Sequence, residues 1–324
     1  MIERETRKES TDFIPYMEAV IKKLKTDKKH PAVHTYTATM NSITLFSEEK
    51  SCEMTIAGVY TRGRLKEYQE WLRQRKASWN TVSTYMRTLK AVYNRLLDDR
   101  LAEYEPKLFE DVYTKVESQT KRSLTQEQAR ALMTADFSVL PANVQRALAY
   151  CLLMFLFRGM PFIDLAYLRK QDLKGDSIVY CRHKTGRQMT VRIPREAVEL
   201  LEKYCNKDPD SGYLFPILDE KIEGEEELYR YYLRSLAKFN RELRVMSRLL
   251  LGNVKISSYT PRHTWATLAF YQGIPIGIIS KALGHSSIKV TETYLRPFEN
   301  EKVDTANDKL ILSVTEEKGE KNAA

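Results

Sequence analysis

The chain has 324 residues, 43% of them hydrophobic, and its 52 Lys and Arg exceed its 43 Asp and Glu to give a formal charge of +9. This length predicts a globular protein of about two domains, and the basic excess favours an anionic partner without identifying one. No apolar run is long enough to span a membrane, the polar start MIERETRKES lacks the apolar centre of a signal peptide, and the four cysteines lie too far apart for a zinc site or a disulfide framework. We therefore expect a soluble intracellular protein with no metal and no disulfide.

The first part of the chain, from about residue 11 to residue 103, has the pattern of a helical domain, and its best-marked helix is expected from Trp79 to Leu97. The apolar residues of that helix recur at steps of three and four and should form a buried stripe. They are Val82, Met86, Leu89, Tyr93 and Leu96. The next face over carries Ser83, Arg87, Lys90 and Asn94.

Positive charge is concentrated in the same region, because residues 72–97 include six basic side chains and no acidic one. Such a surface suits a helix that lies along phosphates. The alternative is an ordinary solvated helix face. The candidate phosphate contacts are Arg73, Arg75, Lys76, Arg87 and Lys90.

An interdomain linker is expected over residues 106–122, where Pro106 and mixed charge replace the helical periodicity and the basic pair Lys121 and Arg122 ends the stretch. A second domain should begin beyond the linker, because Thr125 and Gln128 form a capping-box signature ahead of an apolar run.

The second domain is expected to be mostly helical. Its further helices are predicted at about 141–156, 195–206, 226–250, 261–272 and 275–283, with C-terminal stops at Gly252, Gly273 and Gly284. One stretch breaks this rhythm, because Ser177 to Ile193 has two β-rich arms around Thr185-Gly186 and predicts a hairpin. The predicted fold class is therefore mainly α with a small β-hairpin (α+β).

Near the C-terminus, the segment that begins YTPRHTWATL has the features of an anion-binding site. Thr260 and Pro261 are good N-cap and first-turn residues. They place Arg262 and His263 at a helix N-terminus, where backbone N–H groups and the helix dipole favour an anion such as a phosphate.

A second motif follows, since Gly284 should leave His285 in a turn, nine residues before Tyr294. This order resembles the tyrosine recombinase family, also called the phage integrase family, whose signature is an Arg-His pair, then Leu-Gly-His, then a tyrosine nine residues beyond that histidine. The resemblance implies a site-specific DNA recombinase that forms a 3′-phosphotyrosine intermediate without metal, ATP or another cofactor. It makes Arg262 the second catalytic arginine, His285 the third-box residue and Tyr294 the nucleophile.

The resemblance also implies a domain layout and a set of partners. A SAM-like helical core-binding domain that clasps DNA is expected over residues 1–105, a catalytic domain over 123–300 and a tail over 301–324. The expected partner is double-stranded DNA with paired recombination sites, bound by a homotetramer in the cytoplasm at the nucleoid. The tail has an approximate helical or strand-like apolar pattern of the kind that docks on a neighbouring protomer in the family, formed by Val303, Ala306, Leu310 and Leu312.

Further residues take family positions, and two positions depart from the pattern. Lys184 occupies the place of the mobile catalytic lysine on the hairpin, and Asp164 the place of a supporting acid that is usually Glu. Pro161 stands where the family has its first catalytic arginine. Tyr259 stands where the family most often has histidine, and a phenol with a pKa near ~10 is a poor proton acceptor at neutral pH. His263 is a supporting candidate that on its own is more often structural.

The missing first arginine calls for a substitute, because charge that develops on the scissile phosphate needs a second cation. Arg182 lies two residues before Lys184, and strand alternation would put both side chains on one face of the hairpin, toward the phosphate. Arg158 is the alternative or a partner.

Other functions compete with recombination. A DNA-binding protein of the same fold without catalysis would account for Pro161 and Tyr259. A type IB topoisomerase shares phosphotyrosine chemistry but relaxes supercoils without exchanging strands. A plain transcription factor has no use for the constellation around Tyr294.

Overall fold

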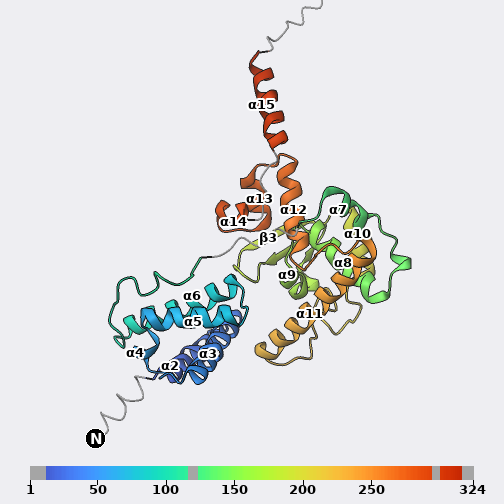
Figure 1. Cartoon of the computed structure of the whole chain (residues 1–324). Helices are drawn as coiled ribbons and strands as arrows, with labels where there is room; N and C mark the ends of the chain where they lie inside the picture. Colours follow the sequence, from blue (N-terminus) through green and yellow to red (C-terminus); the bar gives the residue numbers. More distant parts are fainter. Residues whose placement is uncertain (1–11, 116–122, 294–299, 316–324) are drawn as a thin grey trace, which may run out of the picture. The chain divides into compact units, whose positions relative to one another are not determined.

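The computed structural model describes residues 12–115, 123–293 and 300–315, which fall into two compact units, Met1–Gln119 and Thr120–Ala324 (Figure 1). Unit 1 is helical in its described part. Its helices are α2 (Phe13–Thr26), α3 (His30–Lys50), α4 (Ile56–Val59), α5 (Arg62–Gln74) and α6 (Trp79–Asp98).

The predicted stripe on α6 is buried as expected. All five of its apolar residues, from Val82 to Leu96, are at most 5% exposed, and the helix begins at Ser78, whose hydroxyl accepts a hydrogen bond from the Thr81 backbone N–H. The neighbouring polar face was expected to be exposed, but Ser83 on that face is buried, with 1% of its surface exposed. Both α3 and α5 pack against α6, so that more than one row of its side chains is covered.

The predicted linker starts too early. Leu108, Phe109 and Val112 are buried in the core of unit 1, where the Phe109 ring packs near Tyr60 and Tyr93. These residues lack the helical periodicity that the sequence analysis used, because an irregular segment covers this core. Lys121 and Arg122 lie outside the described residues.

Unit 2 is built around α8 (Ala142–Leu156), which packs against α7 (Gln126–Met133), α10 (Arg195–Tyr204), α11 (Glu225–Leu250) and α12 (Thr260–Tyr271) (Figure 1). An apolar helix that is covered on most sides is typical of a domain centre. The remaining elements are α9 (Phe162–Tyr167), α13 (Ile276–Leu283), α14 (Ile288–Glu292), α15 (Asn300–Thr315) and the 3₁₀ turns η1 (Phe137–Val139) and η2 (Lys170–Asp172).

The bounds predicted for α8, α10, α11, α12 and α13 are confirmed to within two residues. The capping box of α7 is also confirmed, since Thr125 and Gln128 bond each other's backbone N–H groups. No helix was predicted at α9. Gly252, Gly273 and Gly284 follow α11, α12 and α13 with φ of +64°, +77° and +65°. This left-handed conformation costs glycine little and ends the helices there.

The hairpin is confirmed and belongs to a three-stranded antiparallel sheet of order β1-β2-β3. The strands are β1 (Leu173–Lys174), β2 (Ser177–Cys181) and β3 (Gln188–Arg192). Ile178 pairs with Val191 and Tyr180 with Met189, and these four side chains form the buried face of the hairpin. In the described part of the chain, no helix is both long and apolar enough to cross a membrane.

Candidate active site

Arg262 lies at the centre of a buried polar cluster in unit 2. It occupies the first turn of α12 and is 2% exposed. Its guanidinium donates to the backbone oxygens of Gly159 (Nη1–O 2.8 Å) and Leu283 (Nη2–O 2.6 Å), and Nη2 lies 2.8 Å from His285 Nε2. The prediction that Thr260 caps this helix is off by one residue, because Tyr259 takes the N-cap position.

His285 follows Gly284 in the turn after α13, as predicted, and is 7% exposed. Burial and the nearby cations Arg262, Arg182 and Lys184 lower the pKa of His285 to about 3, so its ring is neutral at pH 7. A neutral ring has one N–H. Since the Arg262 guanidinium only donates, His285 Nε2 must accept, and the proton lies on Nδ1.

Thr291, which no sequence motif marked as a site residue, completes this arrangement. The residue is fully buried in α14, and its Oγ1 lies 2.9 Å from His285 Nδ1. The Nδ1–H therefore donates to the Thr291 hydroxyl. The sequence feature that could have indicated Thr291 is its position three residues before Tyr294, in the segment TETY.

A second arginine, Arg182, lies beside Arg262. Its Nη1 donates to the backbone oxygens of Leu283 (2.9 Å) and Gly284 (3.0 Å), so both guanidiniums share the Leu283 carbonyl. Unpaired carbonyls at a helix C-terminus carry partial negative charge and attract cations. The carbonyls at the C-terminal end of α13 therefore bind both Arg182 and Arg262, which are far apart in the sequence.

Asp164 holds Arg182 from the other side. Its Oδ2 accepts from Arg182 Nε at 3.3 Å, and its Oδ1 accepts from the His183 backbone N–H at 2.9 Å. Burial raises the pKa of Asp164, while these two hydrogen bonds act in the opposite direction. The Asp164 carboxylate thus supports an arginine of the cluster.

The predicted alignment of Arg182 with Lys184 on one face is wrong. Arg182 continues the buried face of β2 and is 6% exposed, whereas Lys184 is exposed in the turn that joins β2 to β3. Strand alternation ends where the strand ends at Cys181, so it does not reach Lys184.

Arg158 takes a different position from Arg182. Its backbone φ is +58°, and its Nη1 donates to the backbone oxygen of Thr190 on β3 at 3.3 Å. Its side chain is partly exposed. In the described contacts Arg158 binds the hairpin backbone, while Arg182 binds the carbonyls that also hold Arg262.

Two glycines allow the cluster to pack this closely. A Cβ at Gly159 would lie 3.1 Å from Arg262 Cα, and a Cβ at Gly284 would lie 2.7 Å from Arg182 Cδ and 2.8 Å from Met189 Sδ. Both glycines have positive φ, +68° and +65°. Any side chain at either position would displace an arginine or distort the backbone.

Of the remaining predicted site residues, Tyr259 and His263 lie at the start of α12 beside Arg262, and Tyr294 lies outside the described residues. Tyr259 is 52% exposed, and its ring centroid lies 6.2 Å from that of His263 in the next turn. The predicted nucleophile, Tyr294, lies outside the described residues, which end at residue 293 before resuming at residue 300.

The basic candidates of unit 1 fall into two groups. Arg87 and Lys76 are exposed, and so is Lys90, whose Nζ lies 5.8 Å from the centroid of the Phe109 ring. Arg73 and Arg75 are also exposed but make contacts within unit 1: Arg73 lies over the Trp79 ring at 4.4 Å, and Arg75 lies over the Trp71 ring and pairs with Glu49. Part of the predicted phosphate-binding set is thus engaged in structural contacts.

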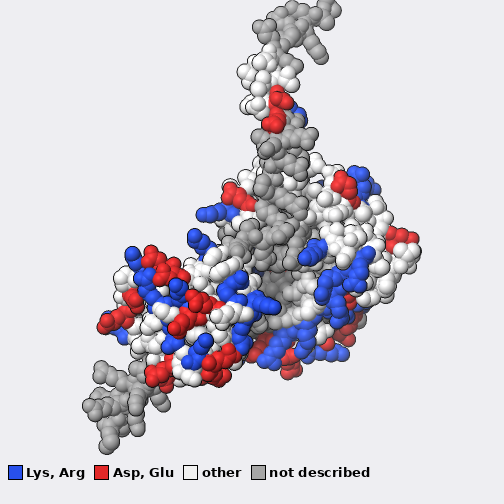
Figure 2. Space-filling model, in the orientation of Figure 1, with Lys and Arg blue, Asp and Glu red and all other residues white. Residues whose placement is uncertain are grey.

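A basic surface on unit 2 was not anticipated. Figure 2 shows Lys and Arg side chains gathered on the visible face of unit 2 where α11 lies. Because α-helical residues three and four apart share a face, the exposed basic residues of α11 form one stripe. They are Arg230, Arg234, Lys238, Arg241, Arg244 and Arg248. The sequence feature that could have predicted this surface is the recurrence of basic residues at steps of three and four over residues 230–248.

The cluster is suited to bind an oxyanion. It combines two buried guanidiniums with a neutral imidazole, and an exposed lysine lies on the adjoining hairpin turn. Among the residues placed by the structure, no group of three or more His, Cys, Asp or Glu side chains is arranged to hold a metal ion.

A helical unit, followed by a mostly helical unit in which arginines and a histidine gather beside a β-hairpin, is the architecture of the tyrosine recombinases. The comparison with known proteins agrees. Residues 122–301 match the phage integrase family and residues 12–110 match the phage integrase SAM-like domain, so the chain belongs to the phage integrase family.

Individual relatives are distant. The tyrosine recombinase XerA of Pyrococcus furiosus is 26% identical over 186 residues, which cover 56% of this chain and 59% of that protein, so the match spans about three fifths of the relative's length. Two solved structures share the fold. The Tn1549 transposon integrase in complex with circular intermediate DNA has a TM-score of 0.64 at 14% identity and covers 93% of this chain and 99% of its own. A lambda integrase dimer bound to a COC′ core site has a TM-score of 0.58 at 15% identity, with 90% and 80% covered.

Proposed function

We propose that this protein is a site-specific DNA recombinase that cuts and rejoins DNA through a covalent bond between Tyr294 and a 3′ phosphate. The observation that carries the proposal is the convergence of Arg262, Arg182 and His285 at the end of α13. An attacked phosphodiester gains negative charge on its oxygens, and fixed guanidiniums neutralise that charge best because they stay ionised and bind two oxygens at once.

The proposed reaction balances within the protein and the DNA. The Tyr294 phenol oxygen bonds to phosphorus, and the bond from phosphorus to the 5′ oxygen breaks. Lys184, in the exposed hairpin turn, donates a proton to the leaving 5′ oxygen. Attack by another 5′ hydroxyl then reverses these steps and releases Tyr294, so rejoining needs no ATP.

His285 is the proposed acceptor of the phenol proton through Nε2, the ring nitrogen without a proton, which is released for this step when Arg262 Nη2 turns from it to the bound phosphate. In the free protein, the pKa of His285 near 3 makes it a weak base. A bound phosphate would add negative charge beside Arg262 and Arg182, and a nearby opposite charge raises a histidine pKa. Substrate binding would therefore activate the base at the moment when it is needed.

Arg182 is proposed to take the part of the family's first arginine, which Pro161 cannot play because it has no cationic group. Arg182 shares the Leu283 carbonyl with Arg262 and is oriented by Asp164. Arg158, which binds the Thr190 carbonyl, is the less favoured substitute.

The proposed substrate is double-stranded DNA with paired recombination sites, bound by four copies of the chain at the nucleoid in the cytoplasm. Relatives described above are a recombinase and two integrases bound to DNA. The proposed phosphate contacts are the exposed residues Arg87 and Lys90 on α6 and, in the basic stripe of α11, Arg241, Arg244 and Arg248. Each such cation releases counterions when it neutralises a phosphate. Arg230 and Arg234 of that stripe pair with Glu226 and Glu227.

A nicked suicide substrate tests the proposal, because the freed fragment diffuses away and traps the covalent protein–DNA adduct. Wild-type protein should form the adduct, and Tyr294→Phe should bind the same DNA with similar affinity but form none, since only the nucleophile is lost. Arg262→Ala should also abolish the adduct and weaken binding only modestly. An adduct from Tyr294→Phe would show that another residue is the nucleophile.

The same assay distinguishes the rival functions. A DNA-binding protein without catalysis, the alternative that Pro161 and Tyr259 motivate, would form no adduct even as wild type. A type IB topoisomerase would relax any supercoiled plasmid, whereas a recombinase should require a defined site.

A further inference from the structure

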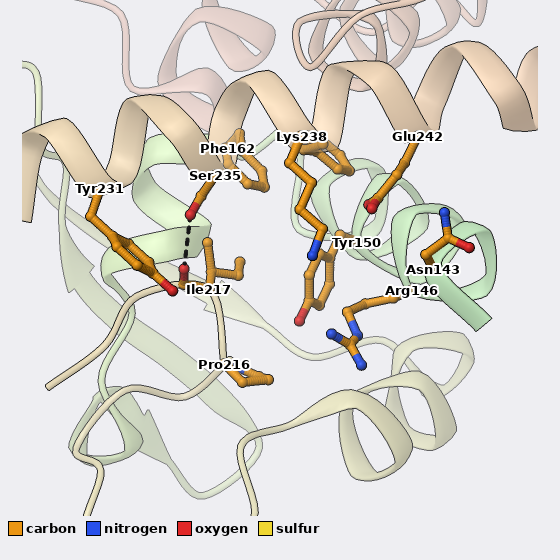
Figure 3. Close-up of a pocket in the computed structure, with 11 residues that line it drawn as sticks. Asn143, Arg146, Tyr150, Phe162, Pro216, Ile217, Tyr231, Ser235, Lys238 and Glu242 are labelled. Atoms are coloured by element: carbon orange, nitrogen blue, oxygen red, sulfur yellow. Dashed lines mark hydrogen bonds between the residues drawn. The ribbon is translucent and has the colours of Figure 1, made fainter.

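A cavity of about 140 Å³ lies in unit 2 between α8, α11 and the loop at Pro216 and Ile217 (Figure 3). None of the residues that line it belongs to the Arg262 cluster. Two aromatic rings line part of the cavity, Phe162 and Phe239, which stack with their centroids 4.3 Å apart. The space is large enough for a small oxyanion together with water.

The cavity contains a buried hydroxyl whose hydrogen bonding is not satisfied by the protein. Tyr150 is 5% exposed, and its Oη is buried with no hydrogen-bond partner. Figure 3 shows the Tyr150 side chain reaching from α8 into the space beneath α11. Buried hydroxyls are nearly always hydrogen-bonded, so an unpaired one indicates a group that the protein alone does not supply.

Three charged side chains surround this hydroxyl. Arg146, one turn before Tyr150 on α8, and Lys238 on α11 are exposed at the rim, and within the described residues neither lies within 4 Å of a carboxylate oxygen. Glu242, one turn after Lys238, is 8% exposed. In Figure 3, Lys238 and Glu242 both reach from α11 toward Tyr150 and Arg146. Two cations and one carboxylate leave the cavity with a net charge of +1.

We propose that this cavity binds inorganic phosphate, with its oxygens held by Arg146, Lys238 and the Tyr150 hydroxyl and its own O–H donated to Glu242. A carboxylate only accepts hydrogen bonds, so Glu242 repels an anion that has no proton to donate. Hydrogen phosphate keeps a proton at pH 7, whereas sulfate and a DNA phosphodiester do not. The acid among the cations therefore selects phosphate over both of these anions.

The site differs in kind from the proposed catalytic centre. The Arg262 cluster presents guanidiniums and a neutral imidazole, and its one acid, Asp164, is occupied by Arg182 and the His183 backbone. Binding of free phosphate in the α8–α11 cavity can therefore be separated experimentally from binding of a DNA diester.

Calorimetric titration of the full-length protein, without DNA, with sodium phosphate and with sodium sulfate at matched ionic strength tests the proposal. At the α8–α11 cavity phosphate should bind saturably, and sulfate should bind there roughly tenfold more weakly or not at all. Tyr150→Phe and Arg146→Gln should each weaken phosphate binding by roughly tenfold. Glu242→Gln should remove the preference over sulfate, because an amide can donate as well as accept.

Two control variants make the result decisive. Arg130→Gln removes an exposed arginine from α7 and should leave phosphate binding unchanged, which rules out a general effect of net charge. Arg262→Ala should keep the phosphate site of the α8–α11 cavity and lose only anion binding at the catalytic cluster, which separates the two sites. Tyr150→Phe should keep the melting temperature of the wild type, because its hydroxyl bonds nothing in the protein.

Three outcomes would overturn the proposal. Equal affinities of the wild type for phosphate and sulfate would show that Glu242 does not select the ligand. Loss of binding in Arg262→Ala but not in Tyr150→Phe would assign the anion to the catalytic centre. Absence of any saturable binding would mean that the cavity holds water only.

Discussion

Arg182 and Arg262 bind the same carbonyl oxygen of Leu283, and this shared contact predicts a shared role at the phosphate. Single-turnover cleavage at saturating protein should fall by about two orders of magnitude or more in Arg182→Ala, as expected for the loss of one transition-state donor. Arg158→Ala should cleave at a nearly normal rate, since its described contact is with Thr190 on β3.

Because Arg182 also pairs with buried Asp164, a loss of cleavage must be separated from a loss of stability. The double variant Arg182→Ala, Asp164→Ala removes the unpaired carboxylate and should recover much of the stability lost in Arg182→Ala without recovering cleavage. Near-normal rates in both single arginine variants would contradict the substitution hypothesis, and a collapse in Arg158→Ala alone would transfer the role to Arg158.

Thr291 is expected to act through His285 as a positioning residue. In Thr291→Val the shape is kept but the acceptor for Nδ1–H is lost, so the neutral ring is held only at Nε2 by Arg262, should lose its fixed orientation, and cleavage should fall by roughly ten- to a hundredfold. Thr291→Ser keeps the hydroxyl and should retain most of the wild-type rate.

The ¹⁵N chemical shifts of the His285 ring give a readout that does not depend on activity. They should report a hydrogen-bonded Nδ1–H in the wild type and in Thr291→Ser, and a shifted Nδ1 resonance in Thr291→Val, where Nδ1–H has lost its acceptor. If Thr291→Val keeps the wild-type Nδ1 resonance, then Thr291 does not position the ring, whatever happens to the cleavage rate.

The turn between α13 and α14 holds the cluster together. The cost of adding a side chain there can be measured by comparing Gly284, in this turn, with Gly273, which follows α12 and has a similar positive φ. Gly284→Ala should lower the free energy of unfolding by about 1 to 3 kcal/mol more than Gly273→Ala. Both changes place a side chain at positive φ, but only the Gly284 Cβ meets Arg182 and Met189, whereas nothing lies within 4 Å of the Gly273 Cβ.

Urea denaturation of the two variants measures this difference. Gly284→Ala should also reduce cleavage, because Arg182 must move, while Gly273→Ala should not. Equal losses of stability would mean that the backbone conformation alone is responsible and that the turn tolerates a side chain.

At the scale of the whole molecule, the C-terminal helix α15 carries several apolar side chains that are exposed to solvent. Leu310, Ile311, Leu312 and Val314 are 50–78% exposed. Such a surface in a protein usually marks an interaction site, and the family resemblance makes a neighbouring copy the expected partner. Deletion of the chain after Phe298 should therefore weaken assembly of a tetramer on paired sites more than binding to one half-site.

Gel-shift titrations with half-site and paired-site DNA separate the two effects. The substitutions Leu310→Ser and Val314→Ser, which keep the helix length, should reproduce the assembly defect in milder form. If deletion weakens half-site and paired-site binding equally, α15 packs on its own unit instead of a second copy.

The sequence by itself was sufficient for α6, for the longer helices and the hairpin of unit 2, and for the order of the motifs, but not for α9 or β1. Periodic apolar residues predicted α6, α8 and α11, and the capping box and the glycines predicted where α7 began and where α13 ended. These signals are local, because a helix is set by residues three and four apart and by the hydrogen bonding at its ends. The same local order placed Arg262 at a helix N-terminus and His285 in a turn.

Only the tertiary structure decided which of these residues meet. Arg262 binds the carbonyl of Gly159, which lies 103 residues away, and Arg182 binds that of Leu283 at a distance of 101 residues. Strand alternation predicted the wrong partner for Arg182, because it stops at the turn and says nothing of α13 or Asp164. Thr291 had no motif that marked it. Contacts of this kind depend on how α9 and the hairpin pack in the main core and how α13 packs on α12 beside them, and packing follows from the shapes of many side chains at once.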